Sequence, residues 1–237
     1  MLIAALATDY DGTLARDGKV AASTLAALER LRASGRKLIM VTGRELPDLR
    51  RVFPEVGGFD AIVAENGALL WRPDQSAPRA LARAPPPAFI AALRARGVEP
   101  LALGEVIVAT ADENAPVMAE ALRAVGLDWR LILNKDSVMC LPPGVDKASG
   151  LRAALAELGL EAENVLGVGD AENDLAFLAA CGVSVAVANA LPGVKAAAGI
   201  VTPDDDGAGV AWLIERLLED PASFAALAQH TTNVAAQ

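Results

Sequence analysis

The stretch LIAALATDYDGT, residues 2–13, joins an apolar run to two carboxylates that lie one residue apart. Residues 2–8 favour a buried β-strand, and Asp9 and Asp11 follow where that strand ends, before the turn residue Gly12. A plain turn is the simpler interpretation, but it leaves the Asp9 charge at a buried strand end without a purpose, which is costly. We therefore interpret Asp9 as a candidate nucleophile and Asp11 as a candidate general acid and base.

Composition excludes several classes of function. The 237 residues carry a net charge of −9, which disfavours binding to nucleic acid and to anionic membrane surfaces. The apolar run at the start is too short for a signal peptide or a membrane span. Cys140 and Cys181 are far apart in the sequence, so we expect both to be reduced thiols in the core, which indicates a cytoplasmic protein. His230 is the only histidine, which excludes catalytic triads built on histidine and zinc sites rich in histidine.

Most of the chain alternates short β-type runs with helical periodicity, the pattern of a parallel sheet with crossover helices. Strands are predicted at residues 2–8, 37–41, 61–64, 165–168, 183–188 and 199–202. Helices are predicted at residues 23–34, 148–158, 174–180 and 207–218, and we expect the tail from His230 to be frayed. The pattern predicts a large α/β domain.

A middle segment behaves differently and predicts an inserted α+β unit. Triple proline at 85–87 and the sequence Pro-Pro-Gly at 142–144 bound it. Helices are predicted at 88–96 and 115–125, and strands at 100–103, 106–110, 129–133 and 138–141. Because proline-rich joints suit a lid hinged to a core, we expect residues 80–143 to form a cap on a core of residues 1–79 and 144–237.

Polar groups stand directly after the predicted parallel strands of the core. Residues 42–44 (Thr-Gly-Arg) follow the second strand, residues 65–67 (Glu-Asn-Gly) follow the third, and Asp170 follows the strand that ends at residue 168. In an open α/β sheet the ligand crevice lies at the carboxyl edge of the strands. These segments, distant in sequence, are therefore predicted to converge on one site with Asp9 and Asp11.

Several of these groups suit a phosphorylated ligand. Thr42 could cap a helix, but its hydroxyl could also donate to a transferring phosphoryl oxygen. Lys147 and Arg44 both lie near a predicted helix start, where a positive charge is unfavourable because it opposes the helix dipole. For Lys147 this position is better explained by a role in neutralising charge on a phosphoryl group than by a surface location. Arg44 is balanced between substrate contact and the surface. Gly43 and Asn173 complete the candidate phosphate-binding set.

The second motif, GVGDAEND at residues 167–174, suggests a metal site. Asp170 beside a glycine-rich turn is best read as a ligand of a hard cation, whereas Asp174 could instead be a dipole-favoured acid at a helix start. With Asp9 and the main-chain carbonyl of Asp11, these carboxylates give an oxygen-only ligand set that suits Mg²⁺. Such a cation would reconcile the acids with an anionic substrate. The acidic run 204–206 is expected to be a solvated loop, and no P-loop occurs.

In this order the motifs resemble those of the haloacid dehalogenase-like hydrolases, in the Cof-like branch of sugar-phosphate and phosphoglycolate phosphatases. The resemblance rests on DYDGT at 9–13, VTGR at 41–44, Lys147 and GDAEND at 169–174, with AENGA at 64–68, Asn189-Ala190 and Val194-Lys195 as further signatures. It implies a Rossmann-like core, a cap inserted after the third strand, Mg²⁺ dependence and phosphomonoester hydrolysis. The acid/base Asp11 speaks against dehalogenase chemistry.

We therefore expect a Mg²⁺-dependent phosphatase, monomer or homodimer, that acts on a small phosphorylated metabolite through an aspartyl-phosphate on Asp9. Cap residues Arg130, Asn134 and Lys135 are candidates for contact with the organic part of the substrate. Three alternatives stay open: a phosphomutase, a phospho-accepting receiver module, and a non-catalytic domain that binds a phosphorylated ligand.

Overall fold

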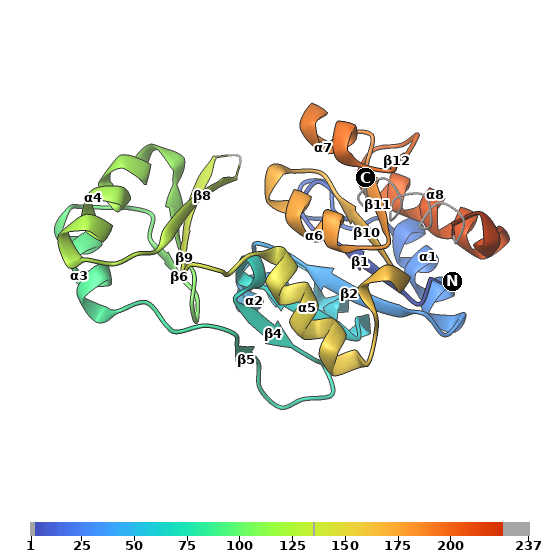
Figure 1. Ribbon diagram of the computed structural model, residues 1–237, viewed down its shortest axis with the longest axis horizontal. Coiled ribbons are helices and arrows are strands. Elements are labelled where there is room, and N and C mark those ends of the chain that lie inside the picture. The colour runs from blue at the N-terminus through green and yellow to red at the C-terminus, as the bar shows by residue number, and fades with distance from the viewer. Residues whose placement is uncertain (1–2, 135, 225–237) are drawn as a thin grey trace, which may run out of the picture.

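The computed structural model describes residues 3–134 and 136–224, which form a large helix-flanked sheet and a smaller unit beside it (Figure 1). The large sheet has the strand order β12-β11-β10-β1-β2-β3-β4-β5. Its strands are β1 (Ala5–Thr8), β2 (Lys37–Val41), β3 (Ala61–Ala64), β4 (Leu69–Trp71), β5 (Arg79–Ala80), β10 (Val165–Gly169), β11 (Val183–Ala186) and β12 (Ile200–Val201). All pairs from β12 to β3 are parallel, and β4 and β5 add an antiparallel edge.

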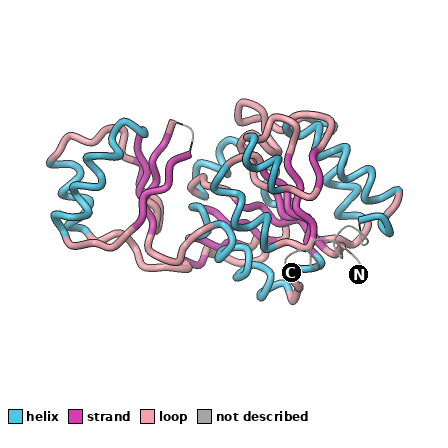
Figure 2. The backbone as a smooth tube through the Cα atoms, turned by 45° about the horizontal axis from the view of Figure 1, so that its top comes forward, coloured by secondary structure: helices cyan, strands magenta, loops and turns pink. Residues whose placement is uncertain are grey.

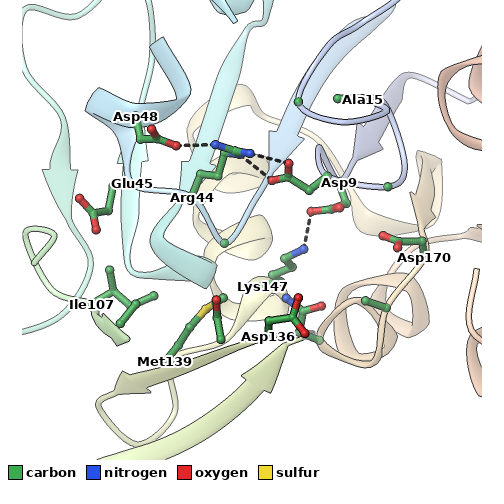
Figure 3. A pocket seen from close by; sticks show the side chains of 18 of the residues that line it. Asp9, Ala15, Arg44, Glu45, Asp48, Ile107, Asp136, Met139, Lys147 and Asp170 are labelled. Carbon is green, nitrogen blue, oxygen red and sulfur yellow. Dashed lines mark hydrogen bonds and ion pairs between the residues drawn. The ribbon is translucent and has the colours of Figure 1, made fainter. Parts of the chain in front are cut away.

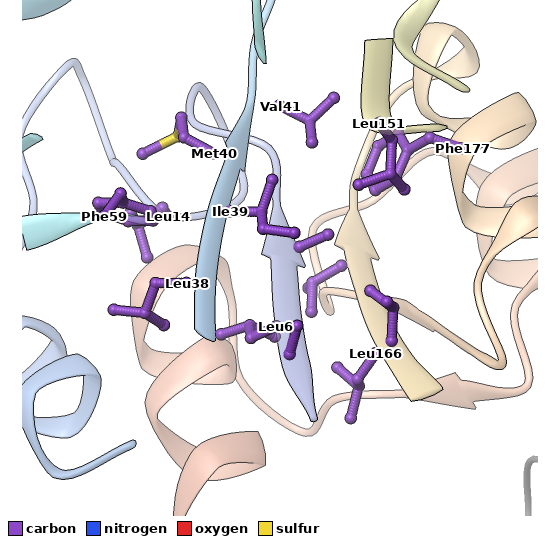
Figure 4. Close-up of a cluster of buried hydrophobic side chains, with 14 of the residues drawn as sticks. Leu6, Leu14, Leu38, Ile39, Met40, Val41, Phe59, Leu151, Leu166 and Phe177 are labelled. Carbon is purple, nitrogen blue, oxygen red and sulfur yellow. The ribbon is translucent and has the colours of Figure 1, made fainter. Parts of the chain in front are cut away.

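Helices cover the large sheet because its central strands are apolar on both faces. Leu38 and Met40 of β2 point to one side and Ile39 and Val41 to the other, toward Leu151 (Figure 4). All four are buried, as expected for a parallel strand covered on both sides. The helices of this unit are α1 (Ala22–Ala33), α2 (Leu46–Val52), α5 (Lys147–Leu158), α6 (Leu175–Ala180), α7 (Pro192–Ala197) and α8 (Asp206–Glu219).

The chain reverses its direction of travel across the sheet at β1. Strands β2 and β3 lie on one side of β1, and β10, β11 and β12 lie on the other. The registers Ala5 to Lys37 and Ala5 to Val165 bring the carboxyl ends of the three central strands level. A ligand crevice forms at such a switch point, so the topology places the end of β1 at its centre.

The smaller unit has two helices on one face of a four-stranded antiparallel sheet of order β6-β7-β9-β8. Its elements are α3 (Pro87–Ala95), β6 (Ala102–Leu103), β7 (Val108–Ala111), α4 (Ala115–Val125), β8 (Arg130–Asn134) and β9 (Ser137–Leu141). The strands stand between these helices and the large unit (Figure 2). Phe89, Leu93, Met118 and Trp129 belong to a separate apolar core. The opposite face of the small sheet is therefore turned toward the large sheet.

The predicted α/β class with a parallel-sheet core is confirmed, and the strands predicted at 37–41 and 61–64 match residue for residue. The strand predicted at 106–110 begins only at Val108, because the N–H groups of Val106 and Ile107 bond to a side chain instead of a neighbouring strand. The helix predicted from Asp174 begins at Leu175, after a short 3₁₀ turn. Helix α2 begins at Leu46, where a helix was expected to follow Thr42 and Arg44, although no bounds were predicted for it. Helix α7 and strands β4 and β5 were not predicted.

In the part of the chain that the structure describes, no helix combines the length and the apolar character that a membrane crossing requires. Lys135 and the C-terminal tail that begins at His230 lie outside the described residues.

Candidate active site

A cavity of about 900 Å³ separates the carboxyl edge of the large sheet from the open face of the small sheet. Its floor includes seven of the predicted site residues: Asp9, Asp11, Gly43, Arg44, Lys147, Asp170 and Asn173. The roof comes from the small unit and includes Ile107, Asp136 and Met139 (Figure 3). Segments far apart in the sequence therefore meet here, as their positions after parallel strands predicted.

A buried cation lies at the centre of the floor. Lys147 Nζ is 2.5 Å from Asp9 Oδ1 and 2.5 Å from Asp174 Oδ1, and its side chain is only 1% exposed. Lys147 is the first residue of α5, and its position is fixed by a capping box in which Asp146 and Ser149 bond to each other's backbone N–H groups. Burial alone would lower the pKa of Lys147, but the Asp174 and Asp9 carboxylates outweigh it and raise that pKa.

Three buried carboxylates form a cluster that could hold a metal ion. Ligand oxygens of Asp9, Asp170 and Asp174 all lie within 4.8 Å of one another. Burial raises the pKa of Asp9, and the Asp174 and Asp170 charges raise it further, while Lys147 opposes them. The three carboxylates thus share one ammonium group, that of Lys147. A hard divalent cation, which prefers oxygen ligands, would fit among them.

The loop after β10 is held in shape by Asp174. Its Oδ2 accepts from the backbone N–H groups of Asp170 and Ala171, at 2.8 and 3.0 Å. Gly169 makes this possible, since a Cβ there would lie 2.7 Å from the Asp174 side chain. Asp170 Oδ1 in turn accepts from the Thr13 hydroxyl at 3.0 Å. Asp174 therefore orients both Lys147 and the segment that presents Asp170.

Asp11 is engaged differently from Asp9. Its two oxygens accept from Nε and Nη2 of Arg44, at 2.6 and 2.7 Å, and Arg44 Nη1 donates to Asp48 Oδ2 at 2.5 Å. The Asp11 side chain does not belong to the buried carboxylate cluster formed by the described residues. Tyr10 between the two acids points into the core and donates to the Gly18 carbonyl at 2.9 Å, as expected for a side chain that faces away from the site.

Thr42 lies just beneath the floor. It is buried, its hydroxyl accepts from the N–H of Arg44 at 3.1 Å, and its carbonyl accepts from the N–H of Asn66. Asn173 lines the cavity and donates to Asn66 Oδ1 at 3.2 Å, while its own Oδ1 is buried and has no hydrogen-bond partner among the described residues. This oxygen can only accept a hydrogen bond, so a phosphoryl oxygen at Asn173 would have to be met by the amide N–H₂ group.

Two further features of the site were not predicted. Asp206, expected in a solvated loop, is buried at the start of α8, where Arg16 Nε bonds its Oδ2 at 2.6 Å and Asn189 bonds its Oδ1 at 2.9 Å. Asn189 also donates to the Gly12 carbonyl at 2.7 Å, so this polar network braces the first turn. Asn189 is part of one of the family signatures, but nothing in the sequence linked it to Asp206, 17 residues further along the chain.

Of the three cap residues predicted to contact the substrate, only Arg130 has a described side chain, and it does not line this cavity. Arg130 bonds the Val145 carbonyl and lines a separate hollow of about 180 Å³. The side chain of Asn134 and all of Lys135 lie outside what the structure describes. Residues that could reach a bound substrate from this side are instead those of the roof, with Asp136 as its charged member.

Comparison with known proteins identifies the family. The model of the haloacid dehalogenase-like hydrolase family matches residues 6–85 and 129–214. A phosphoglycolate phosphatase of Methanothermobacter thermautotrophicus is 33% identical over 90% of this chain and 98% of its own length. Another, from Methanopyrus kandleri, is 29% identical over 90% of this chain and 96% of its own.

Solved structures show the same fold. A haloacid dehalogenase-like hydrolase from Bacteroides thetaiotaomicron superposes with a TM-score of 0.76 at 21% identity, over 90% of this chain and 98% of that one. A sugar phosphatase of subclass IIB of the superfamily gives a TM-score of 0.73 at 20% identity, with the same coverage. These matches confirm the predicted resemblance and the predicted enzyme class, a phosphatase. The chain belongs to the haloacid dehalogenase-like hydrolases.

Proposed function

We propose that this enzyme hydrolyses the phosphoester bond of a small phosphorylated metabolite through an aspartyl-phosphate on Asp9. The observation that carries the proposal is the Asp9 carboxylate on the cavity floor, 2.5 Å from the buried ammonium group of Lys147. A carboxylate held beside a fixed cation can accept a phosphoryl group while the cation offsets the charge that gathers around phosphorus.

The reaction has two steps. Asp9 attacks phosphorus, the bond to the ester oxygen breaks, and Asp11 gives its proton to the departing alcohol. Water then attacks the phosphorus of the aspartyl-phosphate, Asp11 takes a proton from that water, and inorganic phosphate leaves while the Asp9 carboxylate is restored. In this proposal Asp11 exchanges its bonds to Arg44 for one to the leaving oxygen, and Arg44 becomes available to the substrate.

The remaining residues bind and orient the phosphoryl group. In this proposal the Thr42 hydroxyl, the backbone N–H at Gly43 and the Asn173 amide N–H₂ donate to the phosphoryl oxygens. Gly43 and Asn173 line the cavity, and Thr42 lies next to Gly43. Mg²⁺ would be held by Asp9, Asp170, Asp174 and the main-chain carbonyl of Asp11, and when bound it would neutralise charge on the phosphoryl oxygens. The buried oxygen-only donor set supports this choice of metal.

The substrate we propose is a sugar phosphate or a compound similar to phosphoglycolate, in keeping with the relatives and the sugar phosphatase. Residues 80–143 would act as the cap over a catalytic core of residues 1–79 and 144–237. We also place the protein in the cytoplasm, since Cys140 and Cys181 are buried free thiols, and expect a monomer or homodimer.

The test is release of inorganic phosphate from a panel that includes 2-phosphoglycolate and hexose phosphates, with Mg²⁺ or with EDTA. We expect metal-dependent release that Asp9→Asn abolishes. Asp74→Asn, the same change at an exposed acid paired with Arg72, is the matched control and should retain activity. An isomeric phosphate ester without free phosphate would instead indicate a phosphomutase, and no turnover with retained Mg²⁺ binding would indicate a binding domain.

A further inference from the structure

Glu65 is a buried carboxylate that the proposed reaction does not use. It follows β3 in the large unit, and its side chain is almost wholly removed from solvent, with 1% of the residue exposed. Burying a carboxylate is costly unless its oxygens are hydrogen-bonded. The partners of Glu65 therefore indicate what the residue does.

Among the described residues, the Glu65 carboxylate accepts three hydrogen bonds, and all three come from backbone N–H groups of the cap. Oε1 accepts from Glu105 at 2.9 Å, and Oε2 accepts from Val106 at 2.8 Å and from Ile107 at 2.9 Å. These residues form the connection between β6 and β7. A side chain of the core thus holds a loop of the cap. The carboxylate only accepts hydrogen bonds, so it suits a loop that presents three N–H donors.

The two units are shaped for this contact. Gly104 precedes the loop, and a Cβ there would lie 2.5 Å from Glu65 Cδ and Oε1. On the other side Glu65 has a φ of 52° and Asn66 a φ of 54°, a left-handed conformation that non-glycine residues rarely adopt and that costs free energy. Such strain persists only where the surroundings impose it.

The contact connects the phosphate-binding segment to the roof of the cavity. The N–H of Glu65 donates to the Arg44 carbonyl at 2.9 Å, and the N–H of Asn66 donates to the Thr42 carbonyl at 2.9 Å. At the other end, Ile107 both donates to Glu65 and lines the active-site cavity (Figure 3). A displacement of this loop would therefore move a wall of the cavity.

We propose that Glu65 is a positioning residue that acts as a latch: its carboxylate holds the β6–β7 loop so that the cap closes over bound substrate. This inference rests on the proposed function only in its kinetic part. Opening exchanges the three N–H partners for water, so the latch is reversible. Weakening it lowers the fraction of enzyme in the closed state, and the apparent affinity for substrate falls by the same factor.

The test combines small-angle X-ray scattering with steady-state kinetics on Glu65→Gln and Gly104→Ala. Glutamine puts an N–H₂ group against the loop N–H groups, and alanine pushes the loop away while leaving Glu65 intact. Glu105→Gln is the control, because it neutralises an exposed side chain of the same loop and keeps its backbone N–H.

We expect both variants to show a larger radius of gyration than the wild type and a KM raised at least about tenfold, the effect of losing one hydrogen bond to a charged group. Glu105→Gln should match the wild type. Wild-type scattering and KM in both variants would overturn the latch. So would loss of the native circular-dichroism spectrum in Glu65→Gln while Gly104→Ala stays unchanged, since that pattern reports a structural role. Scattering needs no turnover, so it decides the latch even if phosphatase activity is absent.

Discussion

Replacing Lys147 by methionine tests how strongly the centre of the site depends on one charge. Methionine keeps the length of the aliphatic stem and removes the ammonium group. Two carboxylates, Asp9 and Asp174, then lose a partner at 2.5 Å in a place where the lysine side chain is 1% exposed. Removing one partner of a buried ion pair costs about 3–5 kcal/mol, because the other charge stays buried without compensation.

The surface offers a matched comparison. Lys37 Nζ lies 2.8 Å from Asp60 Oδ1, but its side chain is 47% exposed, and an exposed pair contributes about 1 kcal/mol or less. Urea unfolding followed by circular dichroism, at pH 7 with EDTA, gives the free energy of unfolding of each variant. We expect Lys147→Met to lose several times as much as Lys37→Met.

A third variant separates charge from packing. The double variant Lys147→Met/Asp9→Asn lacks one of the two carboxylates that Lys147→Met leaves without a partner. It should therefore recover part of the free energy of unfolding that Lys147→Met loses. Equal small losses in Lys147→Met and Lys37→Met, or a double variant less stable than Lys147→Met, would refute the reasoning that this buried charge balance supports the fold.

Three further outcomes follow from the structure. Mg²⁺ added to EDTA-treated protein should raise the melting temperature by about 5–10 °C at a hundredfold excess over its dissociation constant, and Asp170→Asn, but not Asp74→Asn, should remove that shift. Burial raises the pKa of Cys140 and Cys181 to about 12, so a disulfide reagent at pH 8 should modify neither thiol until urea unfolds the chain. Burial also raises the pKa of Tyr10, the only tyrosine, from 10.0 to about 12, so its phenolate absorbance should appear near pH 12 in native protein. Because the unfolded chain releases that proton first, stability should fall between about pH 10 and 12, and Tyr10→Phe should show no such component.

The sequence predicted those parts of the site that follow apolar strands. Asp9, Thr42 and Asp170 each follow a short apolar run that was predicted to be a buried strand, and parallel topology brings the ends of these strands to one edge. The short elements were missed because they carry too little pattern. Strand β5 has two residues, and helix α7 has six.

Side-chain partners could not be predicted, since they depend on contacts between units. The sequence does not show that Arg44 would donate to both oxygens of Asp11. Glu65 is followed by Asn66 and Gly67, two common turn residues. Nothing in this short segment indicates that the Glu65 carboxylate bonds to a loop forty residues further along the chain. The left-handed φ of Glu65 also runs against the propensity of glutamate, so no local pattern predicts it.

The charge balance of the cavity explains how an acidic protein can receive an anionic substrate. Among the described lining residues the cations are Arg16, Arg44 and Lys147, and each is already bonded to carboxylates. A phosphate group that enters must either displace one of these acids or meet a cation that the protein does not supply. Asp11 can be displaced, because its partner Arg44 is also held by Asp48, whereas Lys147 is enclosed. The proposed Mg²⁺ meets the second need at Asp9 and Asp170. In the proposed reaction Arg44 would contact the substrate, Lys147 would stay paired with Asp9, and the proposed Mg²⁺ would supply the further positive charge that the phosphoryl group needs.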